Sequence, residues 1–208
     1  MDFASLNQGD VEEILCEKRA APRYISLIRA AKLILPQGEF ACVIRDVSQR
    51  GIKVKIFHAL PAECSSILLE LQNGERFALD IVRIEEGEAS FAFTQPVEVD
   101  RLIREHWAYP KRQFRLSIVL PVTLHTPVSA WPGMISNISQ QGARVTCDAR
   151  IARDQMLRIE APQLPELRAK VRWRRNGAYG MVFENTFRLA EIAQLAARLQ
   201  CPELLRAS

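Results

Sequence analysis

Apolar and polar residues alternate along short stretches of this chain, and the alternation occurs in both halves. Ile52, Val54 and Ile56 are separated by lysines, and residues 143–147 repeat the same alternation about ninety residues later. A period of two is typical of a strand with one buried face. Each half is therefore predicted to contain β-strands rather than helices at this point.

The neighbouring apolar stretches follow in the same order in the two halves. Strands are predicted at 30–35, 40–47, 67–71, 76–85 and 89–93, and again at 119–124, 134–139, 167–173 and 179–183. Asn73-Gly74 and Asn176-Gly177 predict hairpins because both turn positions favour positive φ. Gly51 precedes Phe93 by 42 residues, and Gly142 precedes Phe183 by 41.

This repetition predicts a mainly β fold made of two tandem units, each with about six short strands. Such units close into small barrels, which removes exposed sheet edges. The expected organisation is a lead-in at 1–18, a first barrel at 19–98, a connecting helix or linker at 99–108, and a second barrel with a C-terminal helix at 109–208.

Three segments read as helices, at 11–19, 99–107 and 186–200. The last is amphipathic, with Leu189, Ile192, Ala196 and Leu199 on one face and Pro202 after its end. We expect this face to pack across its own barrel, with a partner-binding or membrane-surface role as the alternative.

Composition narrows the classes of function. The chain has 208 residues, 25% charged and 48% hydrophobic, with a net charge of +4, which favours an anionic partner but does not by itself indicate DNA binding. Five dispersed cysteines and three dispersed histidines predict buried thiols and no metal centre. The acidic N-terminus lacks the apolar core of a signal peptide, and no apolar run could span a bilayer, so a cytoplasmic protein without membrane insertion is expected. No catalytic triad, P-loop or carboxylate set for Mg²⁺ is visible, so no enzyme and no cofactor are expected.

A short polar turn is repeated within the strand pattern. Residues 46–51 read DVSQRG and residues 137–142 read NISQQG. Basic clusters precede both turns: Arg19 and Arg23 in the first half, and residues 111–115, KRQFR, in the second. Arg23 lies 23 residues before Asp46, and Arg115 lies 22 residues before the second turn. Each motif alone is weak evidence, but their order and matched spacing in both halves are specific.

With these motifs the chain resembles two tandem PilZ domains, the six-stranded β-barrel receptors for the bacterial messenger cyclic di-GMP. The resemblance covers about 15–100 and 105–200, and includes the closing GMVF at 180–183. It implies a cyclic di-GMP site in the first domain formed by Arg19, Arg23, Asp46, Ser48 and Gly51. It implies a second candidate site formed by Lys111, Arg112, Arg115, Asn137, Ser139 and Gly142.

These residue types suit the ligand. Guanidinium groups pair with phosphates and stack on purines, and Asp46 can accept from guanine N–H groups. The serine hydroxyl can bond a base, a phosphate or its own turn, and a turn closed on itself without ligand is the alternative interpretation. Trp173, in the basic stretch VRWRR, either lines the ligand pocket or an acidic partner site, or belongs to an edge strand with solvated arginines.

The two halves depart differently from the family pattern. The first has the complete arginine motif but carries Ser90 where the second has Gly180. The second has Lys111 where the pattern requires arginine, with Arg112 shifted by one position, and lysine lacks the planar fork.

The resemblance implies a receptor that regulates a protein partner in motility, exopolysaccharide or virulence control. Ligand would order the arginine segment 19–23 against the Asp46 turn and reorient the barrels about 99–107. Two alternatives are a ligand-independent interaction module, above all in the second domain, and a barrel that binds single-stranded nucleic acid. Binding to DNA is not expected, and a homodimer is left open.

Overall fold

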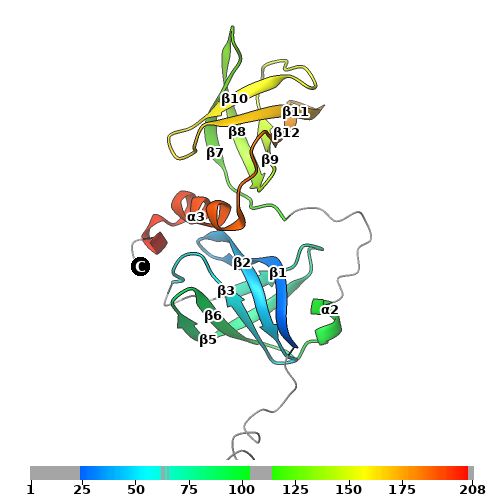
Figure 1. The fold of residues 1–208 in the computed structure, drawn as a ribbon, viewed down its shortest axis with the longest axis vertical. Helices are drawn as coiled ribbons and strands as arrows, with labels where there is room; N and C mark the ends of the chain where they lie inside the picture. The colour runs from blue at the N-terminus through cyan, green and yellow to red at the C-terminus, as the bar shows by residue number, and fades with distance from the viewer. Residues whose placement is uncertain (1–23, 62–63, 65, 104–113, 206–208) are drawn as a thin grey trace, which may run out of the picture.

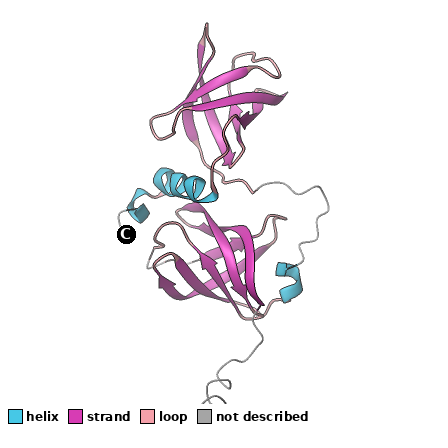
Figure 2. Cartoon of the chain, viewed as in Figure 1, coloured by secondary structure: helices cyan, strands magenta, loops and turns pink. Residues whose placement is uncertain are grey.

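The chain folds into two closed six-stranded antiparallel barrels, as expected (Figure 1). The computed structural model describes residues 24–61, 64, 66–103 and 114–205. Strands dominate, and the few helices lie outside the barrels (Figure 2). The strand order is β1-β2-β3-β6-β5-β4 in the first barrel and β10-β11-β12-β9-β8-β7 in the second. Read in the opposite direction, the second order matches the first strand for strand, so that β7 corresponds to β1 and β10 corresponds to β4.

The first barrel buries one face of each strand around a single core. Its strands are β1 (Tyr24–Leu35), β2 (Gly38–Val47), β3 (Gly51–Lys55), β4 (Ile67–Glu70), β5 (Arg76–Glu85) and β6 (Glu88–Phe93). The alternation predicted for β3 is confirmed, because Ile52 and Val54 are buried while Lys55 is exposed. Phe40 and Phe91 are among the largest fully buried side chains of this core.

The second barrel is built in the same way. Its strands are β7 (Leu120–His125), β8 (Ala130–Ser139), β9 (Gly142–Thr146), β10 (Met156–Glu160), β11 (Leu167–Arg175) and β12 (Ala178–Phe183). Strand β10 is not among the predicted stretches, because it offers only two fully buried positions, Leu157 and Ile159.

The two Asn-Gly hairpins differ from one another. Asn176 has a φ of 49° and Gly177 a φ of 71°, as the dipeptide predicts. At the other hairpin only Gly74 is positive, with a φ of 88°, so the prediction for Asn73 is wrong. Five residues form that turn: the N–H of Leu71 donates to the carbonyl of Glu75 at 2.9 Å.

Among the described residues, an α-helix follows the last strand of each barrel. Helix α2 spans Val99–Ile103, and the guanidinium of Arg29 donates to the carbonyls of Leu102 and Ile103 at 2.7 and 2.8 Å. The rest of the helix predicted at 99–107, and all of that at 11–19, lie outside the described residues. Helix α3 spans Leu189–Gln200 and is followed by the short helix η1, Pro202–Leu205. No helix in the described part of the chain is long and apolar enough to cross a bilayer.

Helix α3 lies between the two barrels (Figure 1). Ile192 and Leu195 are buried in the core of the second barrel, as expected for packing on its own barrel. Ala197 and Leu204, however, belong to the core of the first barrel. The expected packing of α3 on its own barrel is therefore only part of its contacts. Ala197 and Leu204 pack into the core of the first barrel as well.

Candidate functional site

The repeated polar turns are closed by their own serines. The N–H of Ser48 donates to the carbonyl of Gly51 at 2.8 Å, and the N–H of Gly51 donates to the Ser48 hydroxyl at 3.1 Å. In the second barrel the Ser139 hydroxyl donates to the carbonyl of Gly142 at 3.1 Å, and Ser139 is buried. Both serines therefore fix the geometry of the turn, which is the self-bonded arrangement that the sequence left as an alternative.

The two turn glycines meet different surroundings. A Cβ on Gly142 would lie 2.1 Å from the carbonyl oxygen of Met181, whereas a Cβ on Gly51 would lie 3.2 Å from that of Phe91. The backbones of β9 and β12 thus approach each other so closely that only glycine fits in the second barrel.

A β-bulge precedes the first polar residue of each turn. The register of β2 with β3 shifts between Ile44 and Asp46, and that of β8 with β9 shifts between Ile135 and Asn137. Bulges re-aim the side chains that follow them and are frequent beside binding sites. Asp46 and Asn137 are consequently half-buried side chains at equivalent places in the two barrels.

Four side chains form a row across the outer surface of the second barrel. Asn137 is paired with Arg144, Arg144 with Gly180, and Gly180 with Trp173. The Arg115 guanidinium donates to the Asn137 side-chain oxygen at 2.8 Å and so joins the row at its other end. We call Arg115, Asn137, Arg144 and Trp173 the cross-strand row.

Glycine at position 180 allows the indole of Trp173 to lie across β12. A Cβ on Gly180 would fall 1.9 Å from Nε1 of that indole, so the ring occupies the space above the glycine. Trp173 remains 42% exposed, and it is therefore held on one face and open to solvent elsewhere. Strand β11 is an interior strand of the barrel, but its pairing with β10 ends at Lys170 and Trp173 pairs with β12 alone. This end of the strand therefore has one unpaired edge, in agreement with the interpretation of Trp173 as part of an edge with exposed arginines.

The equivalent row of the first barrel has a different chemistry. Asp46 pairs with Lys53, Lys53 with Ser90, and Ser90 with Arg83. Both basic side chains are engaged by carboxylates of the β5–β6 hairpin, Lys53 with Glu88 and Arg83 with Glu85, each at 2.5 Å. The hydrogen bond to Glu88 raises the pKa of Lys53. This row has no aromatic face, and its positive charge is largely neutralised.

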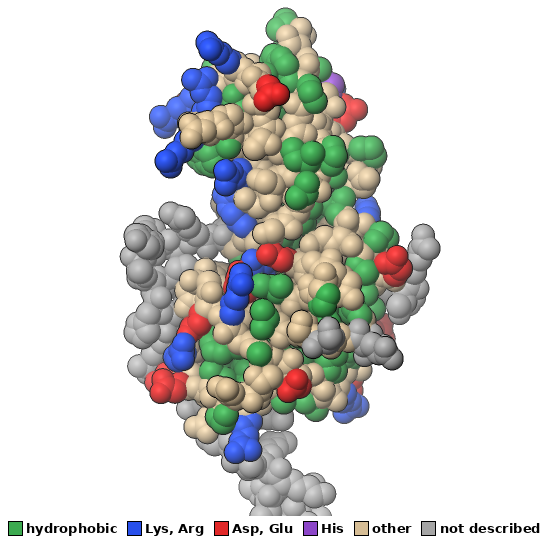
Figure 3. All heavy atoms as spheres, turned by 180° about the vertical axis from the view of Figure 1, so that it is seen from behind, with side chains coloured by type: hydrophobic (Ala, Val, Ile, Leu, Met, Phe, Trp, Pro, Cys, Tyr) green, Lys and Arg blue, Asp and Glu red, His purple; other side chains and the backbone are tan. Residues whose placement is uncertain are grey.

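The charge of the two units follows the same division. Residues 114–205 contain 12 Lys and Arg against 7 Asp and Glu, whereas residues 24–103 contain 9 against 11. In Figure 3 the Lys and Arg side chains gather on one side of the upper barrel, which is the second. The second barrel is therefore the better surface for an anion.

The structure brings together some of the predicted site residues. Arg115 and Asn137 are in contact, and Ser139 and Gly142 build the turn beside them. Arg19, Arg23, Lys111 and Arg112 lie outside the described residues. Arg144 was missed by the sequence analysis; the detectable signal was its place at the first outward position after the second turn, where the first barrel has Lys53.

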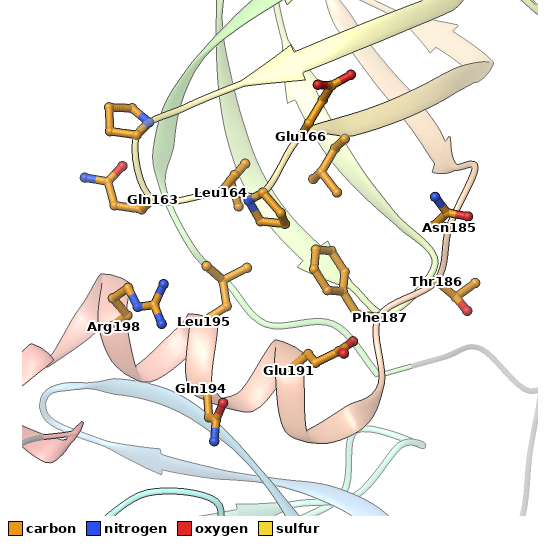
Figure 4. Close-up of a pocket in the computed structure, with 13 residues that line it drawn as sticks. Gln163, Leu164, Glu166, Asn185, Thr186, Phe187, Glu191, Gln194, Leu195 and Arg198 are labelled. Atoms are coloured by element: carbon orange, nitrogen blue, oxygen red, sulfur yellow. The ribbon is translucent and has the colours of Figure 1, made fainter.

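A separate groove of about 610 Å³ lies between the loop joining β10 to β11 and helix α3 (Figure 4). Leu164, Phe187 and Leu195 form its apolar part, and Glu191 and Arg198 lie at its helical wall. None of the cross-strand row lines this groove. Among the described residues, no cluster of His, Cys, Asp and Glu could hold a metal ion.

The second barrel is similar to a known domain family. Residues 110–200 match the PilZ domain model. The chain is similar in structure to PlzA of Borreliella burgdorferi, solved in complex with c-di-GMP (11% identity, 92% of this chain and 98% of that one, TM-score 0.33). It is also similar to the inhibitor of motility MotI/DgrA of Bacillus subtilis (15% identity, 86% and 99%, TM-score 0.36).

A third similar structure is that of YcgR from Escherichia coli in complex with c-di-GMP, with 14% identity over 90% of this chain and 88% of that one and a TM-score of 0.30. No curated protein sequence matches the chain. The family model spans the second barrel and ends with helix α3, so this part of the chain is similar to a PilZ domain.

Proposed function

We propose that this chain is a cytoplasmic, non-catalytic receptor for cyclic di-GMP, and that the second barrel binds the ligand on its cross-strand row. The observation that carries the proposal is the alignment of Arg115, Asn137, Arg144 and Trp173 over neighbouring strands. Two cations, an amide and an aromatic face are the groups that a ligand with two phosphates and two guanines requires.

Each member of the row has a role in this proposal. Arg115 and Arg144 pair with phosphate oxygens through their planar forks and can stack on a purine. The Asn137 amide offers both a donor and an acceptor to the edge of a guanine. Trp173 provides a surface on which a base can stack. Lys111 and Arg112 precede this row in sequence and remain candidates for further phosphate contacts.

Ser139 and Gly142 support the site without touching the ligand in this proposal. The serine hydroxyl is already engaged within the turn, and the glycine lets β9 approach β12. They hold Asn137 in the place that the bulge defines.

A site in the first barrel is the lesser proposal. Asp46, Ser48 and Gly51 are arranged like their counterparts, and the sequence supplies Arg19 and Arg23. The ion pairs of Lys53 and Arg83 nevertheless leave less net positive charge for a phosphate. We infer that the first barrel binds cyclic di-GMP more weakly than the second, or transmits its binding.

In the receptor hypothesis, the ligand changes the relation between the barrels, and a protein partner binds the altered surface. The family resemblance suggests an output in motility, exopolysaccharide or virulence control. Helix α3 packs against the cores of both barrels, which supports this part of the proposal. A shift of either barrel would displace the same helix.

A ligand-independent interaction module is the alternative function. It is favoured by the hydrogen bond between Arg115 and Asn137, which gives each of these side chains a partner without ligand. It is also favoured by Lys111, where the family pattern requires arginine.

Calorimetric titration with cyclic di-GMP separates these functions. The receptor hypothesis expects saturable binding by the native chain, at least a tenfold loss of affinity in Arg115→Ala, and little change in Asp46→Ala. Absence of heat with the native chain would support the interaction module. Binding that follows Asp46 and not Arg115 would place the ligand on the first barrel. Steeply salt-dependent binding of unrelated oligonucleotides without binding of the dinucleotide would indicate a nucleic-acid-binding barrel.

A further inference from the structure

Glu39, near the start of β2 in the first barrel, contacts the segment that carries Arg115 in the second. The N–H of Ser117 donates to Oε2 of Glu39 at 2.8 Å. The same oxygen accepts from Nζ of Lys32 at 3.1 Å. The Glu39 side chain is 17% exposed, so this carboxylate is mostly withdrawn from water and shared between the two barrels.

Helix α3 holds the backbone of the same residue. The Gln200 side chain donates from Nε2 to the carbonyl of Glu39 at 2.8 Å and accepts from its N–H at 2.9 Å. Gly38 makes room for this amide, because a Cβ there would lie 2.3 Å from Oε1 of Gln200. We call Glu39, Ser117 and Gln200 the Glu39 latch.

Two consecutive residues next to Arg115 are therefore fixed by different barrels. Leu116 is fully buried and exchanges two backbone hydrogen bonds with Ile138 of the second barrel, at 2.8 and 3.0 Å. Ser117 is held by Glu39 of the first barrel. Since Arg115 directly precedes this doubly held pair, the direction in which its side chain leaves the backbone depends on both barrels.

We propose that Glu39 is a positioning residue for the ligand site of the second barrel: the Glu39 latch holds Arg115 beside Asn137, and ligand affinity therefore depends on the first barrel. This inference rests on the proposed function. By linkage, cyclic di-GMP bound at the cross-strand row must in turn stabilise the junction between the barrels.

The surroundings of Glu39 provide a matched control. Lys32 lies between two carboxylates, with Glu70 at 2.6 Å on its other side, and Glu70 also bonds Arg76 at 2.7 Å. Removal of either carboxylate leaves the buried ammonium one partner. Glu39→Ala breaks the bond to Ser117, whereas Glu70→Gln alters the same ionic network without touching that bond.

The experiment is calorimetric titration of the full-length variants with cyclic di-GMP. We expect Glu39→Ala to weaken binding at least fivefold, at the low end of couplings between sites. Glu70→Gln should bind like the native chain. Glu39→Gln, whose amide oxygen can still accept from Ser117, should recover most of the affinity. Amide hydrogen exchange of Ser117 without ligand should be faster in Glu39→Ala than in the other two variants.

A double-mutant cycle separates positioning from general destabilisation. If Glu39 acts through Arg115, Glu39→Ala has no further effect on affinity in the Arg115→Ala chain. Equal weakening in both backgrounds, or native affinity in Glu39→Ala, would overturn the inference while leaving the proposed function intact. No binding by the native chain would overturn the proposed function and this inference together.

Discussion

Gly180→Ala should remove the aromatic part of the proposed site while leaving the barrel folded. The added Cβ would lie 1.9, 2.1 and 2.6 Å from Nε1, Cε2 and Cδ1 of Trp173. Ordinary carbon contacts are near 3.5 Å, so the indole must move by about 1.5 Å or leave β12 altogether. Because Trp173 is 42% exposed, it can swing into solvent without opening the core.

The expected magnitude follows from the lost stacking surface. Base–aromatic stacking contributes about 1–3 kcal/mol per base, which corresponds to a loss of affinity of about 5- to 150-fold. The free energy of unfolding should change by less than about 1 kcal/mol, because the nearest atoms to the added Cβ belong to the half-exposed Trp173 side chain and not to the backbone or core. The variant should therefore lose affinity far more than stability.

The assay combines titration with cyclic di-GMP and denaturant unfolding of the same samples. Trp173→Ala should weaken binding as much as Gly180→Ala, and the double variant should be no weaker than either. Ser90→Ala, at the equivalent place in the first barrel, is the matched control and should bind normally. Native affinity in Gly180→Ala would refute the assignment of Trp173 to the site, and a loss of stability beyond about 3 kcal/mol would refute our view of how the indole escapes.

Three further predictions concern the folded chain. Gly142→Ala should destabilise the second barrel by about 2–4 kcal/mol, because its Cβ meets the Met181 carbonyl, whereas Gly51→Ala should change stability by less than about 1 kcal/mol; chemical denaturation compares them. Burial lowers the pKa of His58 below the ordinary value of 6.5, so the unfolded chain binds more protons just below that pH. Stability should therefore fall with decreasing pH below about 6.5, by at most about 1.4 kcal/mol per pH unit, and His58→Gln should flatten this part of the profile; an unchanged profile would contradict it. Leu204→Ala should destabilise the first barrel by about 2–4 kcal/mol although it lies near the chain end, and proteolysis of that barrel should reveal it.

The barrels can be predicted from the sequence because the patterns that specify their strands and turns lie within short stretches of the chain. Alternation at residues such as Ile52 and Val54 is a property of a single strand, and the Asn176-Gly177 turn needs only two residues. Repetition then supplies the number of units. The prediction failed for Asn73, where Leu71 and Glu75 pair across a longer turn that the dipeptide alone does not specify.

The candidate site is harder to predict from the sequence than the barrels, because it depends on strand register. Arg144 and Trp173 are 29 residues apart in sequence and are brought into one row by pairing through Gly180. A bulge before Trp173 shifts the register of β11 with β12, and no local sequence pattern predicts this bulge. The contact between Glu39 and Ser117 spans 78 residues and two domains, so it is visible only in the folded chain.

The most direct test of the proposed site is the NMR spectrum of the native chain during titration with cyclic di-GMP. We expect the indole N–H of Trp173 and the amides around Asn137 and Arg144 to shift saturably, while those around Asp46 and Lys53 move little. Shifts confined to the first barrel, or no shifts at millimolar ligand, would contradict the assignment of the cross-strand row as the messenger's binding surface.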